Sequence, residues 1–244
     1  MTVAMEPLQV PSLKEACVAK LEELILSGDL QIGERLPPER KLAESLDVSR
    51  PVVHQAVVDL AAKGLVEIVP RKGVFVSDYR TTGSCALLTT LLSYHEGKLD
   101  EPFLQSLMDM RLLMEIETAR LAALNRSEQQ LQEFQDLLAL ELETDHGDAE
   151  ALAELDFAFH QLVALASGNL MYPLVINSFK PVYTNFTRQF FAKHQGTKIL
   201  EEVLSFHRQL VAAIVERDGE TTARIMAEML RHGAEMLRHG AENF

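Results

Sequence analysis

Hydrophobic and polar residues in the first eighty positions form short helical patterns separated by turn signals. From Ser12 to Ile25 apolar residues recur at helical spacing, and Ser12 with Glu15 has the pattern of a capping box. This pattern predicts a first helix that ends at Ser27-Gly28-Asp29. Pro37-Pro38 predicts the start of a second, short helix, because proline is tolerated in a first turn whose amide donors are unpaired.

A third helix is predicted from Arg50, with Ser49 as its N-cap and Gly64 as its C-terminal cap. Arg50 and His54 share an outward face, and residues 65–76 predict a β-hairpin with a basic tip. Three helices and a hairpin form the layout of a winged helix-turn-helix, whose third helix can enter a major groove. Arg50 is therefore predicted to contact a base or a phosphate of double-stranded DNA; the alternative is an ordinary solvated arginine. The inward face is apolar: Val53, Val57 and Leu60.

Beyond a linker at residues 81–84 the pattern is helical throughout, with about six or seven helices and short connections. The predicted fold is mainly α: an N-terminal winged helix-turn-helix with a small β-hairpin, then a C-terminal antiparallel all-α bundle able to enclose a cavity. We expect a DNA-binding domain at 1–79, a linker and connecting helix at 80–98, and a helical effector-binding and dimerisation domain at 99–244.

Net charge restricts how the predicted DNA contact can work. The chain carries −13, and residues 1–79 hold 9 basic against 12 acidic side chains. Because DNA is an anion, binding must rest on a few placed cations rather than on bulk charge. The candidates within residues 35–72 are Arg35, Arg40, Lys41, Arg50, Arg71 and Lys72.

Neither a membrane segment nor a disulfide is expected. No apolar run reaches the ~18 residues of a membrane span, and the first sixteen residues lack the pattern of a signal peptide. We therefore expect a cytoplasmic protein without membrane contact. Cys17 and Cys85 have no metal-ligand spacing, and both are expected to be small buried hydrophobic residues.

One polar group in the helical part suggests a metal. Asp156 and His160 are four residues apart on a helix predicted at 148–166, and His207 lies on a later helix predicted at 200–216. A carboxylate and imidazoles that converge inside a bundle could hold a divalent metal ion. On spacing alone the alternative is a core histidine at 160 and an aspartate paired with some cation.

A second polar feature is Arg111, which lies on an apolar helix face with Leu104, Leu107 and Met114. A cation on such a face could anchor a ligand carboxylate by a two-pronged contact. The alternative is an i, i+4 ion pair with Glu115.

The stretch SGDLQIGERLPPERKLAESLDVSRPVVHQAVVDLAAKGLV, residues 27–66, resembles the GntR family of bacterial transcription regulators. This resemblance implies that Arg40, Ser49 and Arg50 contact DNA, together with the wing residues Arg71 and Lys72. Two positions depart from the family pattern: His54 stands where arginine is usual, and Arg71 where glycine is usual. A neutral imidazole cannot form a two-pronged contact with guanine, so either the operator differs at that base or binding is weaker. The set of predicted DNA-binding residues is Arg40, Ser49, Arg50, His54, Arg71 and Lys72.

Residues 99–230 resemble the FCD-type effector domain of the FadR subgroup of this family. By this resemblance a Zn, Ni or Mn ion would be held by Asp156, His160 and His207. A small carboxylate effector would be bound near the metal by Arg111, Asn169 and Tyr183.

The fourth ligand position of the subgroup is Met229, and a thioether is a poor ligand for these metals, so the site would be weakened or completed by water. His232 is a possible substitute one turn further on. However, EMLRHGA occurs at both 228–234 and 235–241, so His232 and His239 could equally belong to a duplicated surface heptad.

A competing signal comes from residues 153–192, which resemble the fatty-acid-responsive members of the subgroup. Those members bind long-chain acyl-CoA in the bundle and hold no metal, so His160 and His207 depart from their pattern. The apolar residues that suit an acyl tunnel suit an ordinary core equally well. They are Phe157, Leu162, Leu165, Leu174, Ile176, Phe179, Phe186 and Phe190.

The leading hypothesis is a homodimeric, ligand-responsive regulator that binds a near-palindromic operator and is not an enzyme. The effector, a carboxylate or an acyl-CoA, would favour one placement of the two DNA-binding domains. The alternatives are a metal-dependent enzyme that uses the Asp156, His160 and His207 cluster, and a constitutive regulator with a degenerate pocket.

Overall fold

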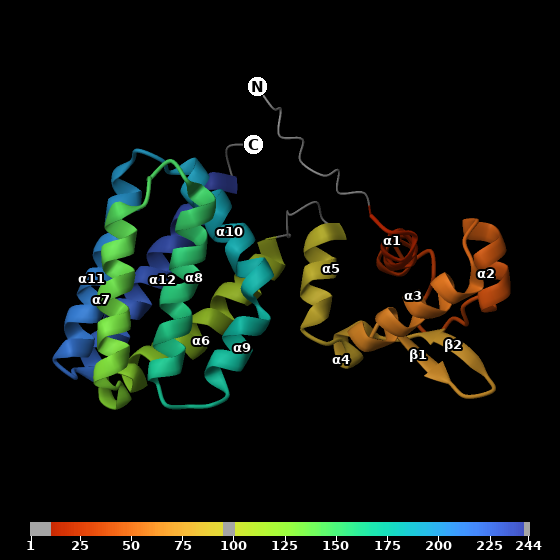
Figure 1. Cartoon of the computed structure of the whole chain (residues 1–244), viewed down its shortest axis with the longest axis horizontal. Coiled ribbons are helices and arrows are strands. Elements are labelled where there is room, and N and C mark those ends of the chain that lie inside the picture. The colour runs from red at the N-terminus through yellow and green to blue at the C-terminus, as the bar shows by residue number, and fades with distance from the viewer. Residues whose placement is uncertain (1–10, 95–100, 242–244) are drawn as a thin grey trace, which may run out of the picture. The chain divides into compact units, whose positions relative to one another are not determined.

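Residues 11–94 and 101–241 are described by the computed structural model (Figure 1), without the side chains of residues 93 and 237–241. The chain divides into two compact units, Met1–Glu96 and Gly97–Phe244. Each unit is described separately below.

The first unit confirms the predicted winged helix-turn-helix. Strands β1 and β2 form an antiparallel hairpin in which Val66 is opposite Val76 and Val69 is opposite Gly73. The elements of this unit are α1 (Leu13–Leu26), α2 (Glu39–Leu46), α3 (Arg50–Lys63), β1 (Val66–Val69), β2 (Gly73–Val76), α4 (Tyr79–Thr82) and α5 (Ala86–Tyr94).

Local capping explains where α1 and α3 begin and end. The Ser12 side chain accepts a hydrogen bond from the Glu15 amide, and the Glu15 carboxylate accepts one from the Ser12 amide, which confirms the capping box. Gly64 ends α3 with φ +79°, a left-handed conformation that favours glycine. A Cβ atom at Gly64 would lie 2.0 Å from the Thr82 carbonyl oxygen, so α4 packs too closely for any other residue.

The core of the first unit forms where α1, α3 and the hairpin meet. Leu21, Val53 and Leu60 are fully buried there, and truncation of such a leucine to alanine costs about 2–5 kcal/mol. The inward stripe predicted for α3 is confirmed. One detail differs from expectation: Cys85 is exposed, whereas Cys17 is buried as expected.

Helix α5 lies within residues 80–98 and packs on the first unit. Lys63 on α3 donates to Glu22 on α1 at 2.5 Å and to Thr90 on α5 at 2.9 Å. The Thr90 hydroxyl donates in turn to Glu22 at 3.0 Å. This cluster ties α1, α3 and α5 together, so the segment after the hairpin extends the first unit.

Seven helices and no strand occur in the described part of the second unit, in agreement with the predicted bundle. Figure 1 shows α7 alongside α11, and α6 packs extensively against α12. The break between α9 and α10 at Phe179 is not evident from the pattern of the sequence. The helices are α6 (Glu101–Asn125), α7 (Glu128–Glu143), α8 (Ala149–Ala166), α9 (Tyr172–Ser178), α10 (Lys180–Lys193), α11 (Lys198–Val215) and α12 (Gly219–Ala241).

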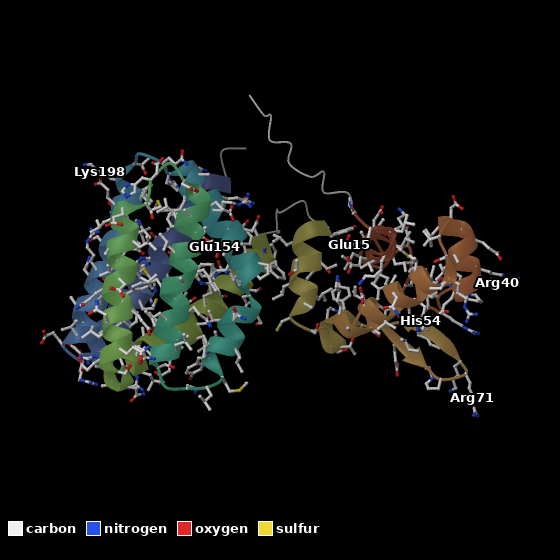
Figure 2. All side chains as sticks on the ribbon, viewed as in Figure 1. Glu15, Arg40, His54, Arg71, Glu154 and Lys198 are labelled. Carbon is white, nitrogen blue, oxygen red and sulfur yellow. The ribbon has the colours of Figure 1, made fainter. Side chains whose placement is uncertain are left out.

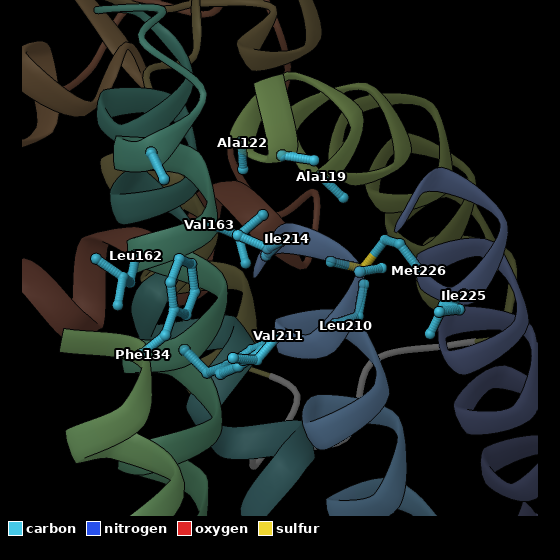
Figure 3. Close-up of a cluster of buried hydrophobic side chains, with 14 of the residues drawn as sticks. Ala119, Ala122, Phe134, Leu162, Val163, Leu210, Val211, Ile214, Ile225 and Met226 are labelled. Atoms are coloured by element: carbon cyan, nitrogen blue, oxygen red, sulfur yellow. The ribbon is translucent and has the colours of Figure 1, made fainter. Parts of the chain in front are cut away.

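The main core of the second unit gathers side chains from α6, α7, α8, α11 and α12 (Figure 3). Ala119 and Ala122 on α6 are fully buried, and their small side chains allow close approach of neighbouring helices. Phe134 on α7 and Phe159 on α8 stack edge to face at 5.7 Å between ring centres. The Phe159 ring stacks on the imidazole of His207 at 4.0 Å, so this core directly supports a candidate site residue.

Candidate effector site and DNA-binding surface

Three predicted metal ligands converge inside the bundle. Asp156 and His160 project from one face of α8, and His207 projects from α11. All three are buried, and each offers a ligand atom that lies within 4.8 Å of the other two. An oxygen and two nitrogens at this separation are a suitable set for one divalent cation.

Both histidines are held through Nδ1 by a buried glutamate. Nδ1 of His207 lies 2.6 Å from Oε1 of Glu141 on α7, and Nδ1 of His160 forms an ion pair with Oε2 of Glu115 on α6. Nε2 of His207 has no hydrogen-bond partner among the described residues and lies 3.5 Å from Oδ1 of Asp156. A metal-binding imidazole is typically anchored in this way at its second nitrogen, so the residues present fit a metal ion.

Electrostatics keep the carboxylates of this cluster ionised. Burial raises the pKa of Asp156, but His207 and His160 outweigh it and lower that pKa to about 2. Burial likewise opposes ionisation of Glu115, whose pKa the neighbouring Arg111 and His160 lower to about 2. Burial raises the pKa of Tyr183 well above its ordinary value. The phenol therefore keeps its proton and donates a hydrogen bond to Oδ2 of Asp156 at 2.5 Å.

A cavity of about 70 Å³ lies beside these residues, with room for a few water molecules. Its polar residues are Arg111, Asp156, His160, Tyr183 and Thr187. The rest is mainly apolar, contributed by Leu104, Leu107, Met108, Phe186, Phe190, Phe191, Val203, Met229 and Leu230.

Arg111 forms the ion pair that was one of the two interpretations of its sequence position. Its Nε donates to Glu115 at 2.6 Å, which is the predicted i, i+4 ion pair, and its Nη2 donates to the Tyr183 hydroxyl at 3.1 Å. The same guanidinium lines the cavity, so the ion pair does not remove it from the candidate site.

The structure does not bring Asn169 to the cavity. It is exposed in the loop between α8 and α9, where its side-chain oxygen accepts a hydrogen bond from the Met171 amide. Gly168, with φ +76°, turns the chain outward just before it.

Among the described residues, no imidazole other than that of His160 lines the cavity. Met229 is buried and lines the cavity, as its position in the sequence suggests. His232 instead forms an ion pair with Glu202 at 3.2 Å and is not among the cavity-lining residues. The side chain of His239 lies outside the described residues.

Most of the apolar residues considered for an acyl tunnel lie elsewhere. Phe186 and Phe190 line the cavity, but Leu165 is 49% exposed and Leu174 is 64% exposed. Phe157 and Ile176 belong to a small core that also contains Tyr183. The cavity volume of about 70 Å³ favours a small ligand over a long acyl chain.

The predicted DNA-binding residues lie on one unit, and two of them, Arg50 and His54, contact a carboxylate that the sequence interpretation did not include. Nε of Arg50 lies 3.2 Å from Oε2 of Glu39, and Nδ1 of His54 lies 2.8 Å from Oε1 of the same side chain. Glu39 begins α2 and is largely covered, whereas Arg50 and His54 remain exposed. The sequence signal for this contact was the position of Glu39, an acidic residue directly after Pro37-Pro38 at the start of the predicted second helix.

The remaining candidate DNA contacts are exposed. Arg40 and the wing residues Arg71 and Lys72 are open to solvent, and Figure 2 shows Arg40, His54 and Arg71 along one side of the first unit. Ser49 is the N-cap of α3, but its hydroxyl makes no capping hydrogen bond. Arg71 has φ +64°, a left-handed conformation that strains a residue with a side chain.

A winged helix-turn-helix followed by a helical domain with a polar cavity defines a class of ligand-responsive transcription regulators. The family model described as bacterial regulatory proteins, gntR family, matches residues 13–76, and the FCD domain model matches residues 106–232. The chain therefore belongs to the GntR family of transcription regulators, in the branch that carries an FCD domain.

Individual relatives agree with this assignment. The chain is 36% identical to the HTH-type transcriptional regulator Mce2R of Mycobacterium tuberculosis over 183 residues, 74% of each protein. It is 30% identical to the fatty acid metabolism regulator protein of Escherichia coli O1:K1 / APEC over 195 residues, 80% of this chain and 77% of the relative. The solved structure of Lar, described as controlling expression of the Listeria monocytogenes agr system, has a TM-score of 0.63 at 17% identity. That match covers 95% of this chain and 99% of Lar and shows the fold alone.

These findings make the chain a ligand-responsive, DNA-binding transcription regulator rather than an enzyme. No helix in the described part of the chain is long and apolar enough to cross a membrane.

Proposed function

We propose that this regulator binds a near-palindromic operator as a homodimer and responds to a small carboxylate bound beside a metal ion in its helical unit. Asp156, His160 and His207 would be the metal ligands, and Arg111 would hold the carboxylate. The observation that supports this proposal best is the free, buried Nε2 of His207, whose ring is fixed from the other side by Glu141.

A divalent Zn, Ni or Mn ion would supply a Lewis-acidic position for one carboxylate oxygen. Three protein ligands leave coordination positions open for that oxygen or for water, as in sites that bind exchangeable ligands. Met229 lies in the same cavity wall but offers only a thioether, so we expect weaker metal affinity than a fourth imidazole would give.

The chemistry of the cavity wall narrows the effector class. Arg111 is the one guanidinium among the lining residues, so one carboxylate can be paired there. Beyond it the wall is mainly leucine, methionine, valine and phenylalanine, which disfavours a second carboxylate or several hydroxyl groups. We therefore infer a monocarboxylate with a short apolar tail.

DNA binding is assigned to the exposed face of the first unit. Arg50 and His54 would contact bases from α3, while Ser49, Arg40 and the wing residues Arg71 and Lys72 would contact phosphates. A dimer would present this small set of cations to the DNA twice, so the number of phosphate contacts would double although residues 1–79 stay net negative.

The decisive experiment measures the metal content of the purified protein by mass spectrometry. We expect about one divalent metal ion per chain in the wild type and in the control His146→Ala, which removes an exposed histidine. His207→Ala is expected to lose the metal, with circular dichroism to check that the helices persist. A metal content unaffected by His207→Ala would contradict the assignment.

Ligand class is tested on the same samples by thermal unfolding. Short aliphatic or aromatic monocarboxylates should raise the melting temperature of the metal-loaded protein more than citrate or malate does. Metal-free wild-type protein that releases DNA on addition of acyl-CoA would instead support a fatty-acid regulator.

A further inference from the structure

An open groove of about 560 Å³ lies in the first unit, between the hairpin and the helices α2 and α3. Its charged lining residues are four arginines and one carboxylate, namely Arg35, Arg40, Arg50, Arg71 and Glu39. Because residues 1–79 carry more acidic than basic side chains, this excess of positive charge is local. The groove is therefore a surface that attracts anions on a unit that is net negative.

The segment before α2 pairs with β2 of the hairpin. The amide of Val76 donates to the carbonyl oxygen of Glu34 at 2.9 Å, and the amide of Leu36 donates to that of Val74 at 2.9 Å. Arg35 lies between these two hydrogen bonds and forms an antiparallel bridge with Phe75. The pattern of the sequence did not predict this pairing, which fixes the backbone of Arg35 beside the wing.

Gly73 leaves room for the side chain of Arg35. A Cβ atom at position 73 would lie 2.7 Å from Nε and 3.1 Å from Nη2 of Arg35, so the guanidinium lies directly against the glycine. Arg35 is nevertheless exposed. Among the described residues, neither Arg35 nor Arg71 has a carboxylate within ion-pair distance, whereas Arg50 pairs with Glu39. Two guanidinium groups in one groove are thus available to an anion from outside the chain.

We infer that this groove binds the sugar–phosphate backbone of one DNA strand and that Arg35 is a phosphate contact. The inference rests on the proposed DNA binding of the first unit. A guanidinium can donate to two phosphate oxygens at once, and such contacts position a protein on DNA without reading its sequence. The uncharged lining residues are apolar, among them Leu36, Pro38 and Ile68, which suits the carbon atoms of deoxyribose better than a hydrated phosphate ion.

The test begins with the operator, which is obtained by selecting sequences bound by the full-length wild type from a random double-stranded DNA library. Arg35→Gln should then bind the operator and random DNA more weakly by the same factor, roughly 10-fold per subunit, the lower range for a hydrogen bond to a charged group. The salt dependence of both should weaken by about one counterion per subunit. Arg35→Lys keeps the charge and should keep the salt dependence.

Lys20→Gln is the matched control for net charge. Lys20 is an exposed cation of the same unit, pairs with Glu23 and does not line the groove. It removes the same charge as Arg35→Gln, so a smaller effect on DNA binding shows that the position of Arg35 matters. Melting temperatures check that each variant is folded.

Neutral methylphosphonate groups, placed one at a time along the operator, identify the phosphate that Arg35 contacts. One position in each half-site should weaken binding of the wild type without weakening binding of Arg35→Gln further, because the variant has already lost that contact. Additive losses at every position would show that Arg35 contacts none of these phosphates and would overturn the inference.

The remaining outcomes separate this inference from the proposed function. Failure of the wild type to select any sequence overturns both. Equal affinity and salt dependence of Arg35→Gln and Lys20→Gln overturn the inference alone. A loss confined to the operator, with binding of random DNA unchanged, assigns Arg35 to a base and also overturns it. Thermal stabilisation by inorganic phosphate that requires Arg35, without any change in DNA binding, assigns the groove to a free anion instead and overturns it as well.

Discussion

Nδ1 of His207 lies 2.6 Å from Oε1 of Glu141, and both side chains are buried. They come from different helices, α11 and α7, so the pair is a product of tertiary packing. The contact fixes the orientation of the imidazole and directs Nε2 toward Asp156. It also makes Glu141 a positioning residue for the candidate metal site, although Glu141 is not a ligand itself.

Replacing Glu141 by glutamine should weaken metal binding without emptying the ligand set. Loss of the anchoring carboxylate typically lowers metal affinity about 10- to 100-fold. The measurement is a competition titration with a chromophoric chelator. Glu143→Gln is the matched control, because Glu143 lies two residues away on the exposed face of α7. Equal affinities of the two variants would show that Glu141 does not support the site.

Stability of the metal-free protein should fall as the pH rises above neutrality. Burial lowers the pKa of His207, but the neighbouring carboxylates of Asp156 and Glu141 outweigh burial and raise it to about 9. Because the pKa of His207 is higher in the folded protein than in the unfolded chain, protonated His207 stabilises the fold fully below the unfolded pKa of about 6.5. This stabilisation is lost as the pH rises through the folded pKa of about 9. The expected decrease in the free energy of unfolding is on the order of 3 kcal/mol.

The measurement is urea unfolding of chelator-treated protein at pH 6.5 and at pH 9. His207→Gln removes the titrating group and should flatten this dependence. An equally steep decrease in His207→Gln would assign the effect to another group.

Local sequence signals predict the helices and strands of this fold, whereas contacts between helices can be predicted from the sequence only in part. The boundary at Gly64 could be predicted because capping depends on a few neighbouring residues. The pairing of Asp156 with His160 follows from helical spacing. Glu141 was missed because its partner is 66 residues away, although its position on the apolar face of α7 with Phe134 was a usable signal. The same reason explains why Glu39 was not connected with His54.

Arg71→Gly separates backbone strain from DNA contact. Relief of the left-handed conformation stabilises the fold by about 1–2 kcal/mol, and the greater freedom of glycine in the unfolded chain offsets part of this gain. We expect a net increase of roughly 0.5–1 kcal/mol in the free energy of unfolding. The loss of one cation should reduce the salt dependence of DNA binding by about one counterion per subunit.

Urea unfolding and binding titrations over a range of salt concentrations measure the two effects. Arg71→Lys keeps both the charge and the strained conformation, so it should resemble the wild type in both measurements. A destabilised Arg71→Gly would indicate that the arginine side chain contributes packing that outweighs its strain.

Arg50→Ala should abolish operator-specific binding while leaving the fold intact. The side chain is 72% exposed, so its removal creates no cavity, and its partner Glu39 is close enough to solvent to be hydrated. Loss of a two-pronged guanine contact costs about 1–3 kcal/mol per half-site, and the proposed dimer would lose it twice, so operator affinity should fall at least about 30-fold. Binding to random DNA should fall far less, because it depends on phosphate contacts.

The matched control is Arg80→Ala, which removes an arginine of similar exposure that pairs with Asp78 outside α3. Titration of the wild type and both variants against operator and random DNA measures the specificity ratio, and a ratio unchanged in Arg50→Ala would contradict its assignment to base recognition.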